Sequence, residues 1–242
     1  MRTVRIYEGE ANLVPGQNFK LSDDGFGHLC RVLRFQEGDD FVVFDGHGHE
    51  YNARLLEVKK TATAICLEAI DRDNESPLEV ELGQVISRGE KMEFTIQKAV
   101  ELGISKITPL YSRRCGVKLD DKRQDKKLSQ WQKIANSACE QCYRSTVPVV
   151  NPIMDLKTWC EQQDSEVLSL TLDPKAQCKI KDLKIKGKIR LLIGPEGGLS
   201  DEEIITARNC GFVGVTLGPR ILRTETAALA ALCVLGAHFG DL

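Results

Sequence analysis

Two glycine-rich segments near the carboxyl end of the 242-residue chain hold the residues best suited to chemistry. The first, LLIGPEGGLSDEE, spans residues 191–203, and the second, LGPRILRTETAALAALCVLG, spans residues 217–236. Each follows an apolar run typical of a strand and leads into a run typical of a helix. Because ligands of open α/β sheets lie beyond the carboxyl ends of the strands, these two neighbouring turns predict the walls of one pocket.

The first turn lacks the common fingerprints of a phosphate-binding loop. Gly194, Gly197 and Gly198 have no Cβ, so their backbone can adopt positive φ and approach a ligand closely. However, no GK[ST] follows, and no GxGxxG pattern accompanies a strand. Ser200 and the three acids after it predict a helix N-cap that offsets the helix dipole and would repel phosphate. A plain capped turn explains those residues, but it leaves Glu196 and the adjoining glycines unexplained.

Four charged residues in or near these blocks are candidates for acid–base chemistry or charge stabilisation. Glu196 and Glu225 can each accept a proton, whereas Arg144 and Arg223 can stabilise negative charge on a carbonyl oxygen. Glu225 would equally suit the first turn of the last helix as a partner of its dipole, and that alternative stays open. Arginine is costly to bury without a partner, which favours functional roles for Arg144 and Arg223.

Composition narrows the class of protein. The hydrophobic fraction of 42% is ample for a packed core. The first ten residues are polar, and the longest apolar run, residues 227–237, is too short to cross a bilayer, so a cytoplasmic location is expected. The nine cysteines are therefore expected to stay reduced. Cys139 and Cys142 have the spacing of half a zinc site, but no second pair follows, and no metal is expected.

Charge is segregated along the chain, although the formal net charge is only −2. Residues 1–75 contain 9 Lys and Arg against 14 Asp and Glu, whereas residues 84–150 contain 13 against 7. Such a local basic excess can hold phosphates because attraction to a polyanion acts over about a Debye length. The densest part includes Arg113 and Arg114. A solvated face balanced by nearby acids is the alternative interpretation.

The hydrophobic pattern changes across a polar stretch at residues 71–77, which predicts a domain boundary. Before it, short alternating runs punctuated by turns predict a small barrel. One helical interruption, at residues 23–35, would place Leu29, Val32 and Leu33 on one face. After the boundary, strands alternate with helical patterns, which predicts a mostly parallel sheet covered by helices. The expected helices span about residues 90–102, 124–142 and 224–238.

Four blocks of this sequence resemble the SPOUT superfamily of trefoil-knot RNA methyltransferases, and within it the 16S ribosomal RNA uridine-N3 methyltransferase family. Two of the blocks are the carboxyl-terminal segments described above. The other two are RGEKMEFTIQKAVELGISKITPL at residues 88–110 and ANSACEQCYRSTVPVV at residues 135–150. In addition, VLR at residues 32–34 is similar to a block of the family's amino-terminal module. The resemblance implies an α/β fold with a SPOUT-type trefoil-knot domain at residues 74–242, preceded by a PUA-like RNA-binding β-barrel at residues 1–73.

The resemblance also implies an activity: methylation of the N3 of a specific uridine in small-subunit 16S ribosomal RNA, on the assembled subunit, with S-adenosyl-L-methionine as cofactor. The family acts as a homodimer with the knot at its interface, which implies that Arg144 reaches the pocket of the partner subunit. Arg223, Arg144 and Glu225 are the expected catalytic residues. The expected cofactor-binding residues lie in three loops: Thr171, Leu172, Gly194, Pro195, Glu196, Gly197, Leu217, Gly218, Ile221, Leu222 and Arg223. The expected RNA contacts are His28, Arg31, Arg34, Arg113 and Arg114.

Two other functions remain open at this point. The chain could methylate a different RNA position, such as a ribose 2′-hydroxyl, or it could be a non-catalytic RNA-binding factor of ribosome assembly. ACEQCYR and the PUA-like amino-terminal module disfavour the first alternative, and the intact GPEGG and LRTETA disfavour the second.

Overall fold

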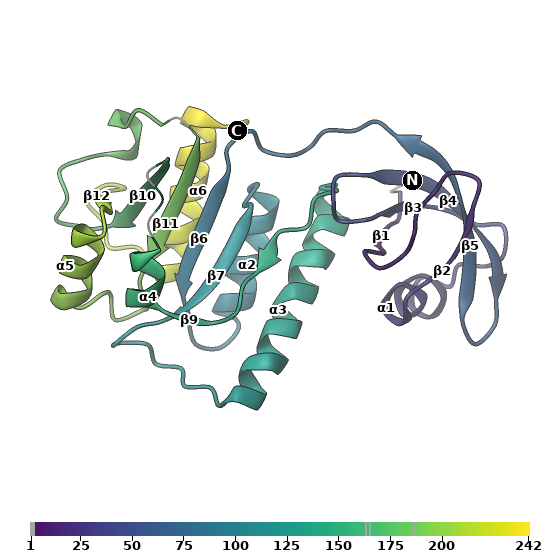
Figure 1. The fold of residues 1–242 in the computed structure, drawn as a ribbon, viewed down its shortest axis with the longest axis horizontal. Helices are drawn as coiled ribbons and strands as arrows, with labels where there is room; N and C mark the ends of the chain where they lie inside the picture. Colours follow the sequence, from purple (N-terminus) through teal and green to yellow (C-terminus); the bar gives the residue numbers. More distant parts are fainter. Residues whose placement is uncertain (1–2, 163, 165, 186) are drawn as a thin grey trace. The chain divides into compact units, whose positions relative to one another are not determined.

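The computed structural model describes residues 3–162, 164, 166–185 and 187–242, and the chain forms two compact units (Figure 1). The first unit comprises Met1–Glu75 and Asn136–Val147, and the second comprises Ser76–Ala135 and Pro148–Leu242. The expected boundary at residue 73 lies close to the first of these divisions. The structure differs from the expectation in the segment 136–147, which belongs to the first unit although it is distant from it in sequence.

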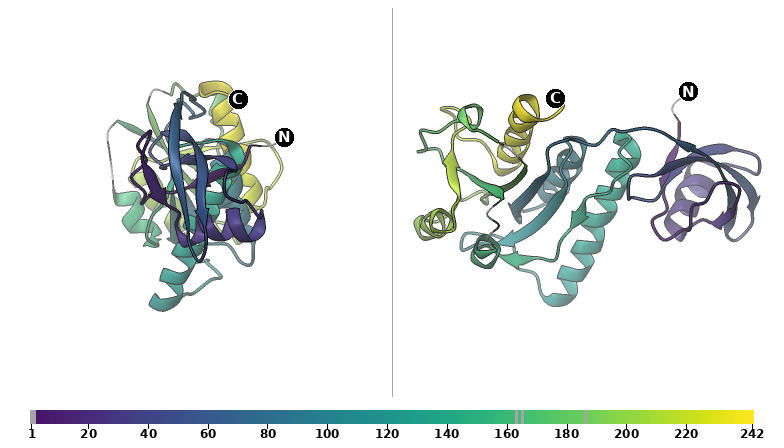
Figure 2. Two further views of the ribbon diagram at one scale, coloured as in Figure 1. Left: turned by 90° about the vertical axis from the view of Figure 1, so that its right-hand side faces the viewer. Right: turned by 45° about the horizontal axis from the view of Figure 1, so that its top comes forward.

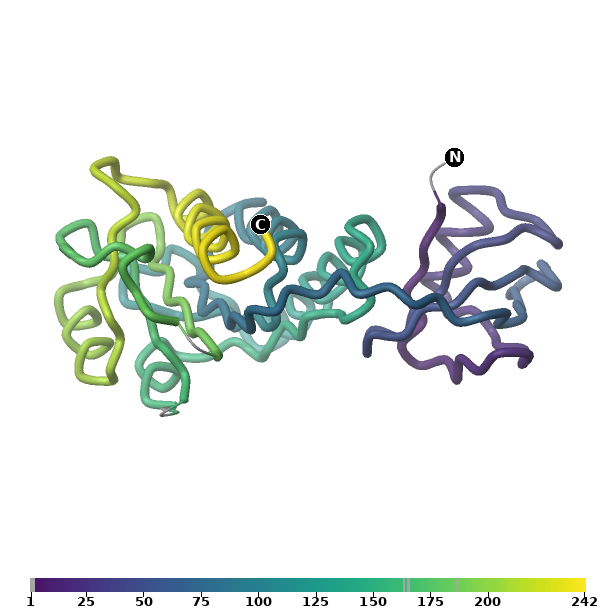
Figure 3. Tube along the Cα trace, turned by 90° about the horizontal axis from the view of Figure 1, so that it is seen from above, coloured from purple at the N-terminus to yellow at the C-terminus, as the bar shows by residue number. Residues whose placement is uncertain are grey.

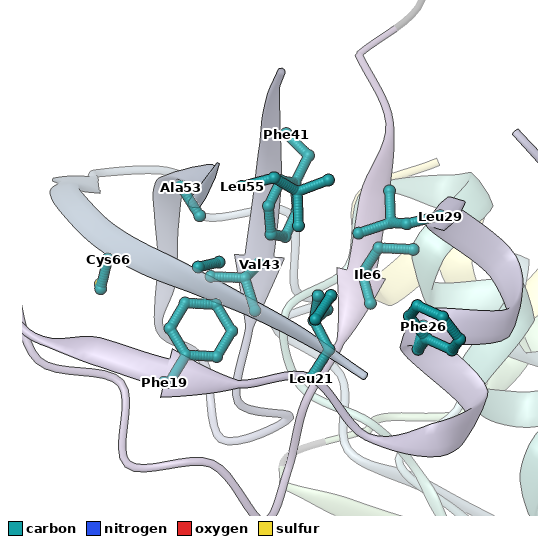
Figure 4. Packing of buried hydrophobic residues seen from close by; sticks show 12 residues of the cluster. Ile6, Phe19, Leu21, Phe26, Leu29, Phe41, Val43, Ala53, Leu55 and Cys66 are labelled. Atoms are coloured by element: carbon teal, nitrogen blue, oxygen red, sulfur yellow. The ribbon is translucent and has the colours of Figure 1, made fainter. Parts of the chain in front are cut away.

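The first unit is built on a five-stranded sheet in the order β1-β3-β4-β5-β2. All neighbouring strands are antiparallel except β1 and β3, which are parallel. Alternating side chains of these strands point inward and form one apolar core with the short helical segment (Figure 4). The strands are β1 (Arg5–Tyr7), β2 (Asn18–Lys20), β3 (Asp40–Phe44), β4 (Glu50–Val58) and β5 (Ala62–Ile70).

The helical interruption of this unit begins as α1 (Asp23–Phe26) and continues as the π-helical turn η1 (Gly27–Val32). Leu29 is completely buried, as expected, but Val32 is 69% exposed and Leu33 is 40% exposed. The prediction of one shared apolar face was therefore wrong. In a π turn the hydrogen bonds span five residues, as between the Leu33 N–H and the His28 carbonyl, so later side chains leave the 3.6-residue period.

The segment 136–147 is held in the first unit by hydrogen bonds from the buried Arg5 and by the ion pair of Arg144 with Glu75. The Arg5 guanidinium donates to Glu50 Oε2 at 2.7 Å and to the Cys139 carbonyl at 2.8 Å. Arg144 binds Glu75 through its Nε and Nη2 atoms, at 2.9 and 2.7 Å. Because arginine is costly to bury unpaired, these contacts explain why the end of a helix from one half of the sequence folds with the barrel strands.

The second unit has a seven-stranded sheet in the order β12-β10-β11-β6-β7-β8, with β9 also paired to β7. All of these strand pairs are parallel, which confirms the expected α/β pattern. The strands are β6 (Val80–Val85), β7 (Lys106–Tyr111), β8 (Val149–Val150), β9 (Met154–Asp155), β10 (Val167–Leu172), β11 (Lys188–Ile193) and β12 (Val213–Val215).

Helices cover both faces of this sheet (Figure 2). α2 and α6 pack against each other on one face, where they run side by side (Figure 3), and α4 packs against α5 on the other. None of the helices in the described ranges is long and apolar enough to cross a membrane. The helices are α2 (Lys91–Glu101), α3 (Asp121–Cys142), α4 (Leu156–Glu161), the short 3₁₀ turn η2 (Ile180–Asp182), α5 (Asp201–Asn209) and α6 (Thr224–Phe239).

The parallel sheet brings the loops after β6, β10, β11 and β12 to one edge. The loop after β11 leads directly into α5, whose N-cap is Ser200. Ser200 Oγ accepts from the Glu203 N–H, and the Glu203 carboxylate accepts from the Ser200 N–H, which completes a capping box. The predicted N-cap is confirmed, and the glycine turn therefore ends at a well-defined residue.

Candidate active site

A pocket of about 250 Å³ opens at the carboxyl ends of β10, β11 and β12. Its walls are the loops that follow these three strands, closed by the first turns of α5 and α6. Most of the expected cofactor-binding residues line it: Leu172, Gly194, Pro195, Glu196, Leu217, Gly218, Ile221 and Leu222. The exceptions are Thr171, Gly197 and Arg223. Thr171 is buried, and its hydroxyl points to the Leu192 carbonyl within the sheet.

Two glycines of the pocket are required by its geometry. Gly218 has a φ of +122°, a conformation that residues with a Cβ rarely adopt. At Gly194 a Cβ would lie 3.0 Å from Leu199 Cγ, so the backbone of the β11 loop packs closely on its own return. A side chain at Gly218 would therefore strain the backbone of the loop after β12, whereas one at Gly194 would press against Leu199.

A buried polar relay joins three segments around the pocket. Gln84, at the end of β6, donates through Nε2 to Thr224 Oγ1 at 2.9 Å, and Thr224 Oγ1 donates to the Gly194 carbonyl at 2.7 Å. Gln84 is completely buried, and Thr224 lines the pocket at the start of α6. The local sequence does not reveal this contact, because nothing near Gln84 or Thr224 in the chain indicates which distant residue each one meets.

Asp173 is a second pocket residue that the motifs did not identify. Its side chain is largely buried, and its Oδ2 accepts from Arg208 Nη2 at 2.9 Å. The available signal was its position, since it is an acid directly after an apolar strand of a parallel sheet.

Three charged side chains meet beside the pocket. Lys91 Nζ lies 3.5 Å from Glu196 Oε1 and 3.9 Å from Glu225 Oε2. Although burial alone raises the pKa of Glu196, its own backbone N–H, the Arg88 N–H and the Lys91 ammonium together hold that pKa below its usual value. Glu196 is therefore ionised at neutral pH. Glu225 Oε2 is buried and has no hydrogen-bond partner among the described residues.

The two arginines after β7 contact the same region. Arg114 Nη1 donates to the Gly197 carbonyl at 3.1 Å and to the Leu199 carbonyl at 3.3 Å, so it supports the glycine turn from outside. Arg113 is exposed and forms an ion pair with Glu202 of α5. Arg113 therefore stays a predicted RNA contact, whereas the observed contacts of Arg114 also serve the loop.

The three expected RNA contacts of the first unit lie together on η1 and just after it. His28, Arg31 and Arg34 are all exposed. Arg31 stacks on the Phe26 ring at 5.0 Å, and Arg34 adopts a φ of +60°. Their exposure is compatible with RNA binding, which remains a prediction.

The expected catalytic residues occupy different surroundings. Arg223 is exposed at the N-cap of α6, and Glu225 lies in the first turn of that helix. Arg144 lies in the first unit, where it is 5% exposed and binds Glu75. Neither Cys139 nor Cys142 forms a disulfide with a described residue, and within the described ranges no cluster of three His, Cys, Asp or Glu side chains could hold a metal ion.

Comparisons with known proteins match both units. Residues 74–236 match the family of the RNA methyltransferase domain, and residues 21–65 match the RNA methyltransferase PUA domain. The ribosomal RNA small subunit methyltransferase E of Buchnera aphidicola subsp. Schizaphis graminum is 39% identical over 228 residues, covering 93% of each chain. The Bacillus subtilis protein of the same name is 32% identical and covers 90% of this chain and 89% of its own.

Solved structures extend the match to the whole fold. The ribosomal RNA small subunit methyltransferase E of Neisseria gonorrhoeae, bound to S-adenosyl methionine, has a TM-score of 0.93 at 42% identity. A putative methyltransferase of Legionella pneumophila, in complex with the same cofactor, has a TM-score of 0.96 at 40% identity. Both alignments cover 100% of each chain. The expected fold class is thus confirmed, and the chain belongs to the ribosomal RNA small subunit methyltransferase E family, SPOUT-type RNA methyltransferases that carry an amino-terminal PUA domain.

Proposed function

We propose that this protein transfers the methyl group of S-adenosyl-L-methionine to the N3 of a uridine in small-subunit 16S ribosomal RNA. The observation that carries the proposal is the three-loop pocket, which lies in a chain that aligns end to end with two cofactor-bound relatives. The choice of uridine N3 rests on the resemblance of the four sequence blocks to the uridine-N3 family.

The residues of the pocket suit this cofactor. Its walls combine apolar side chains such as Leu172, Leu217 and Leu222 with the backbone groups of two glycine-containing loops, which can bind an adenine and its ribose. The ionised Glu196 at its edge favours a cationic ligand. When bound, S-adenosyl-L-methionine supplies an electrophilic methyl group on a positively charged sulfur.

The side chains beside the pocket can accept a proton from the uridine and stabilise the negative charge that this leaves on it. Uridine N3 carries a proton that must leave before or during methyl transfer. Glu225 has a buried carboxylate oxygen with no hydrogen-bond partner among the described residues, and we assign it the role of proton acceptor. Lys91 and Arg223 can stabilise negative charge on the uracil carbonyl oxygens, and Lys91 also keeps a positive charge near both carboxylates. Alignment of uridine N3 with the methyl group and its sulfur supplies the rest of the rate acceleration.

The finer setting is also proposed. N3 lies on the pairing edge of uracil, so the target nucleotide must be unpaired or extruded when it reacts. The substrate is then a structured but locally open RNA, which we infer to be the assembled small subunit in the cytoplasm. The protein acts there as a homodimer through its methyltransferase domain, with Arg144 supplied by the partner subunit.

The direct test is transfer of labelled methyl from S-adenosyl-L-methionine to small ribosomal subunits that lack their modifications, followed by nucleoside mass spectrometry. The expected product is 3-methyluridine. Free 16S RNA, assayed in parallel, is expected to be a poorer substrate than the subunit.

Each other outcome identifies an alternative. A ribose-methylated nucleoside would show that the enzyme acts on another RNA position. Cofactor binding without any labelled product on subunits would contradict the proposed substrate. Binding of RNA with neither cofactor binding nor methyl transfer would indicate a non-catalytic assembly factor.

A further inference from the structure

A second cavity, of about 680 Å³, lies in the same unit between α2, α3 and the loops after β6 and β7. It shares no lining residue with the three-loop pocket. Its volume is within the range of pockets that bind small ligands. Its apolar walls include Ile86, Met92, Val117 and Leu119. Phe94 also lines it and is 46% exposed, so an aromatic face is accessible to solvent there.

Three polar atoms of its lining residues are buried without a hydrogen-bond partner anywhere in the described chain. They are Ser87 Oγ, Glu93 Oε2 and Trp131 Nε1. Ser87 is 3% exposed and Trp131 is 2% exposed. The other oxygen of Glu93, Oε1, accepts from Lys127 at 2.9 Å. Buried polar groups in native proteins are nearly always bonded, so three unbonded groups on residues that line one cavity point to a ligand that supplies the missing bonds.

The chemistry of these groups fits the edge of a nucleobase. The Trp131 indole N–H can only donate, the Glu93 carboxylate oxygen can only accept, and the Ser87 hydroxyl can do both. A base edge presents acceptors next to N–H donors in one plane, and its flat faces suit apolar and aromatic walls. Proteins that read unstacked bases combine these two features, stacking on aromatic rings and hydrogen bonding to the edge.

The surroundings of the cavity favour a base that belongs to RNA. The loop that carries Ser87 also carries Arg88, whose N–H binds Glu196 at the three-loop pocket, at 3.1 Å. Val117 and Leu119 line the cavity, and Lys118 between them is exposed. Lys118 and Lys122 have no ion-pair partner among the described residues, and the surrounding region, residues 84–150, has a basic excess. Phosphates adjoining a bound base would meet these lysines.

We propose that this cavity binds a second, unstacked nucleobase of the substrate RNA, close to the uridine that is methylated. The proposal rests on the proposed function for the identity of the RNA. Its role is to position the RNA, because none of the three polar groups contacts the cofactor pocket.

The test uses the full-length protein and measures the dissociation constant for unmodified small ribosomal subunits. Trp131→Phe removes only the indole N–H, and Ser87→Ala removes only the hydroxyl. Each is expected to weaken binding by about 2- to 10-fold, as for one lost hydrogen bond. Phe94→Ala is expected to weaken binding about 5- to 100-fold through lost stacking. Ile205→Ala is the matched control, since Ile205 is 55% exposed on α5 and lines neither pocket.

Affinity for S-adenosyl-L-methionine reports whether each variant is folded, and it is expected to be unchanged in all four. If Trp131→Phe fails to fold, Ser87→Ala and Phe94→Ala still decide the question. Wild-type affinity for subunits in both would overturn the proposal.

Two further measurements distinguish this proposal from binding of a free nucleotide and from failure of the proposed function. The 5′-monophosphates of the four ribonucleosides are expected to bind only at millimolar concentration; micromolar binding that Trp131→Phe abolishes would assign the cavity to a free nucleotide and overturn the RNA source. If the wild type methylates subunits and all three variants bind subunits with unaltered affinity, the proposed role of the cavity is refuted but the proposed function stands. Weakened binding with no methyl transfer by the wild type supports the cavity and refutes the proposed function.

Discussion

At the scale of single residues, the site depends on how Lys91 is shared between two carboxylates. Glu196 accepts a backbone hydrogen bond and has a lowered pKa, so it binds protons weakly and suits binding rather than proton transfer. Glu225 has a buried oxygen with no bonded partner in the described chain, and its 3.9 Å separation from Lys91 Nζ is too long for a hydrogen bond. Glu225 is thus the carboxylate that we propose as the acceptor of the N3 proton.

Glu225→Gln tests this assignment. The amide has the same shape but cannot accept the proton, so turnover is expected to fall about 10²- to 10⁴-fold, the usual contribution of a general base. Affinity for S-adenosyl-L-methionine should stay unchanged, because Glu225 does not line the cofactor pocket. Single-turnover methylation of small subunits measures the rate, and Glu161→Gln, at an exposed position of α4, is the control. An unaltered rate would show that Glu225 is not the proton acceptor and would favour the alternative, in which it is a partner of the α6 dipole.

At the scale of elements, the start of α1 is tied to the end of β1 by a buried carboxyl group. Glu8 accepts from the Ser22 N–H at 3.0 Å and from Ser22 Oγ at 3.1 Å, and Ser22 is the N-cap of α1. At Gly25 a Cβ would lie 2.1 Å from Glu8 Oε1, so only glycine leaves room for this contact. Burial raises the pKa of Glu8 to about 7, against the opposing effect of the Ser22 hydrogen bonds.

Glu8 should therefore make the stability of the first unit depend on pH. The folded state binds its proton more tightly than the unfolded chain, whose glutamate pKa is about 4.3. The free energy of unfolding is expected to decrease as pH rises through the window from about 4.3 to 7, by about 4 kcal/mol in total, and then to level off. Burial also raises the pKa of Glu140, which adds a change of the same sign.

Urea unfolding of wild type and Glu8→Gln at pH 5, 6, 7 and 8 measures this effect. The difference between the two proteins should change in favour of the variant from pH 5 to 7 and level off by pH 8, while Glu10→Gln, at an exposed position two residues away, should follow the wild type. A constant difference between wild type and Glu8→Gln would show that Glu8 does not titrate on folding.

At the scale of the whole molecule, Arg144 connects folding with the proposed dimer. Its guanidinium binds Glu75, and the other oxygen of Glu75 accepts from the Ser145 and Thr146 N–H groups at 3.1 and 3.0 Å. These contacts hold the segment after α3 in the first unit. A catalytic role requires in addition that Arg144 act on a pocket of the partner subunit, which is a property of the assembled dimer.

Subunit mixing distinguishes these roles. A dimer of about 54 kDa is expected by light scattering, twice the 26.9 kDa chain. Arg144→Ala and Glu225→Gln are each expected to be nearly inactive. If Arg144 acts across the interface, exchanged mixtures regain about a quarter of wild-type activity, because each two-fold heterodimer contains one site with both residues intact.

Glu75→Gln serves as the control for folding, since it removes the ionic partner of Arg144 but retains the guanidinium. It should lower the stability of the first unit and keep more activity than Arg144→Ala. A protein that stays monomeric, or mixtures without recovered activity, would exclude action across the interface.

Local patterns in the sequence were sufficient for most elements. α2 and α6 agree with the predicted helices within one residue, and the N-cap at Ser200 was predicted from four adjacent residues. These features depend on contacts between residues close together in sequence, so periodicity and capping rules predict them. Two of the three pocket loops were located for the same reason, because glycine turns follow β11 and β12 directly, whereas the loop after β10 was implied by the family resemblance.

Contacts between distant residues were decided only by the tertiary structure. No local pattern pairs Lys91 with Glu225, or Gln84 with Thr224, since the choice depends on how α6 packs beside β6 and α2. The π turn that exposes Val32 was not predictable from a 3.6-residue period. The contact of Arg144 with Glu75 forms only because the segment after α3 folds with the strands of the first unit. The sequence by itself therefore determined the elements, the family and the glycine loops, whereas packing decided which side chains meet, because side-chain direction and partners are set by the whole fold.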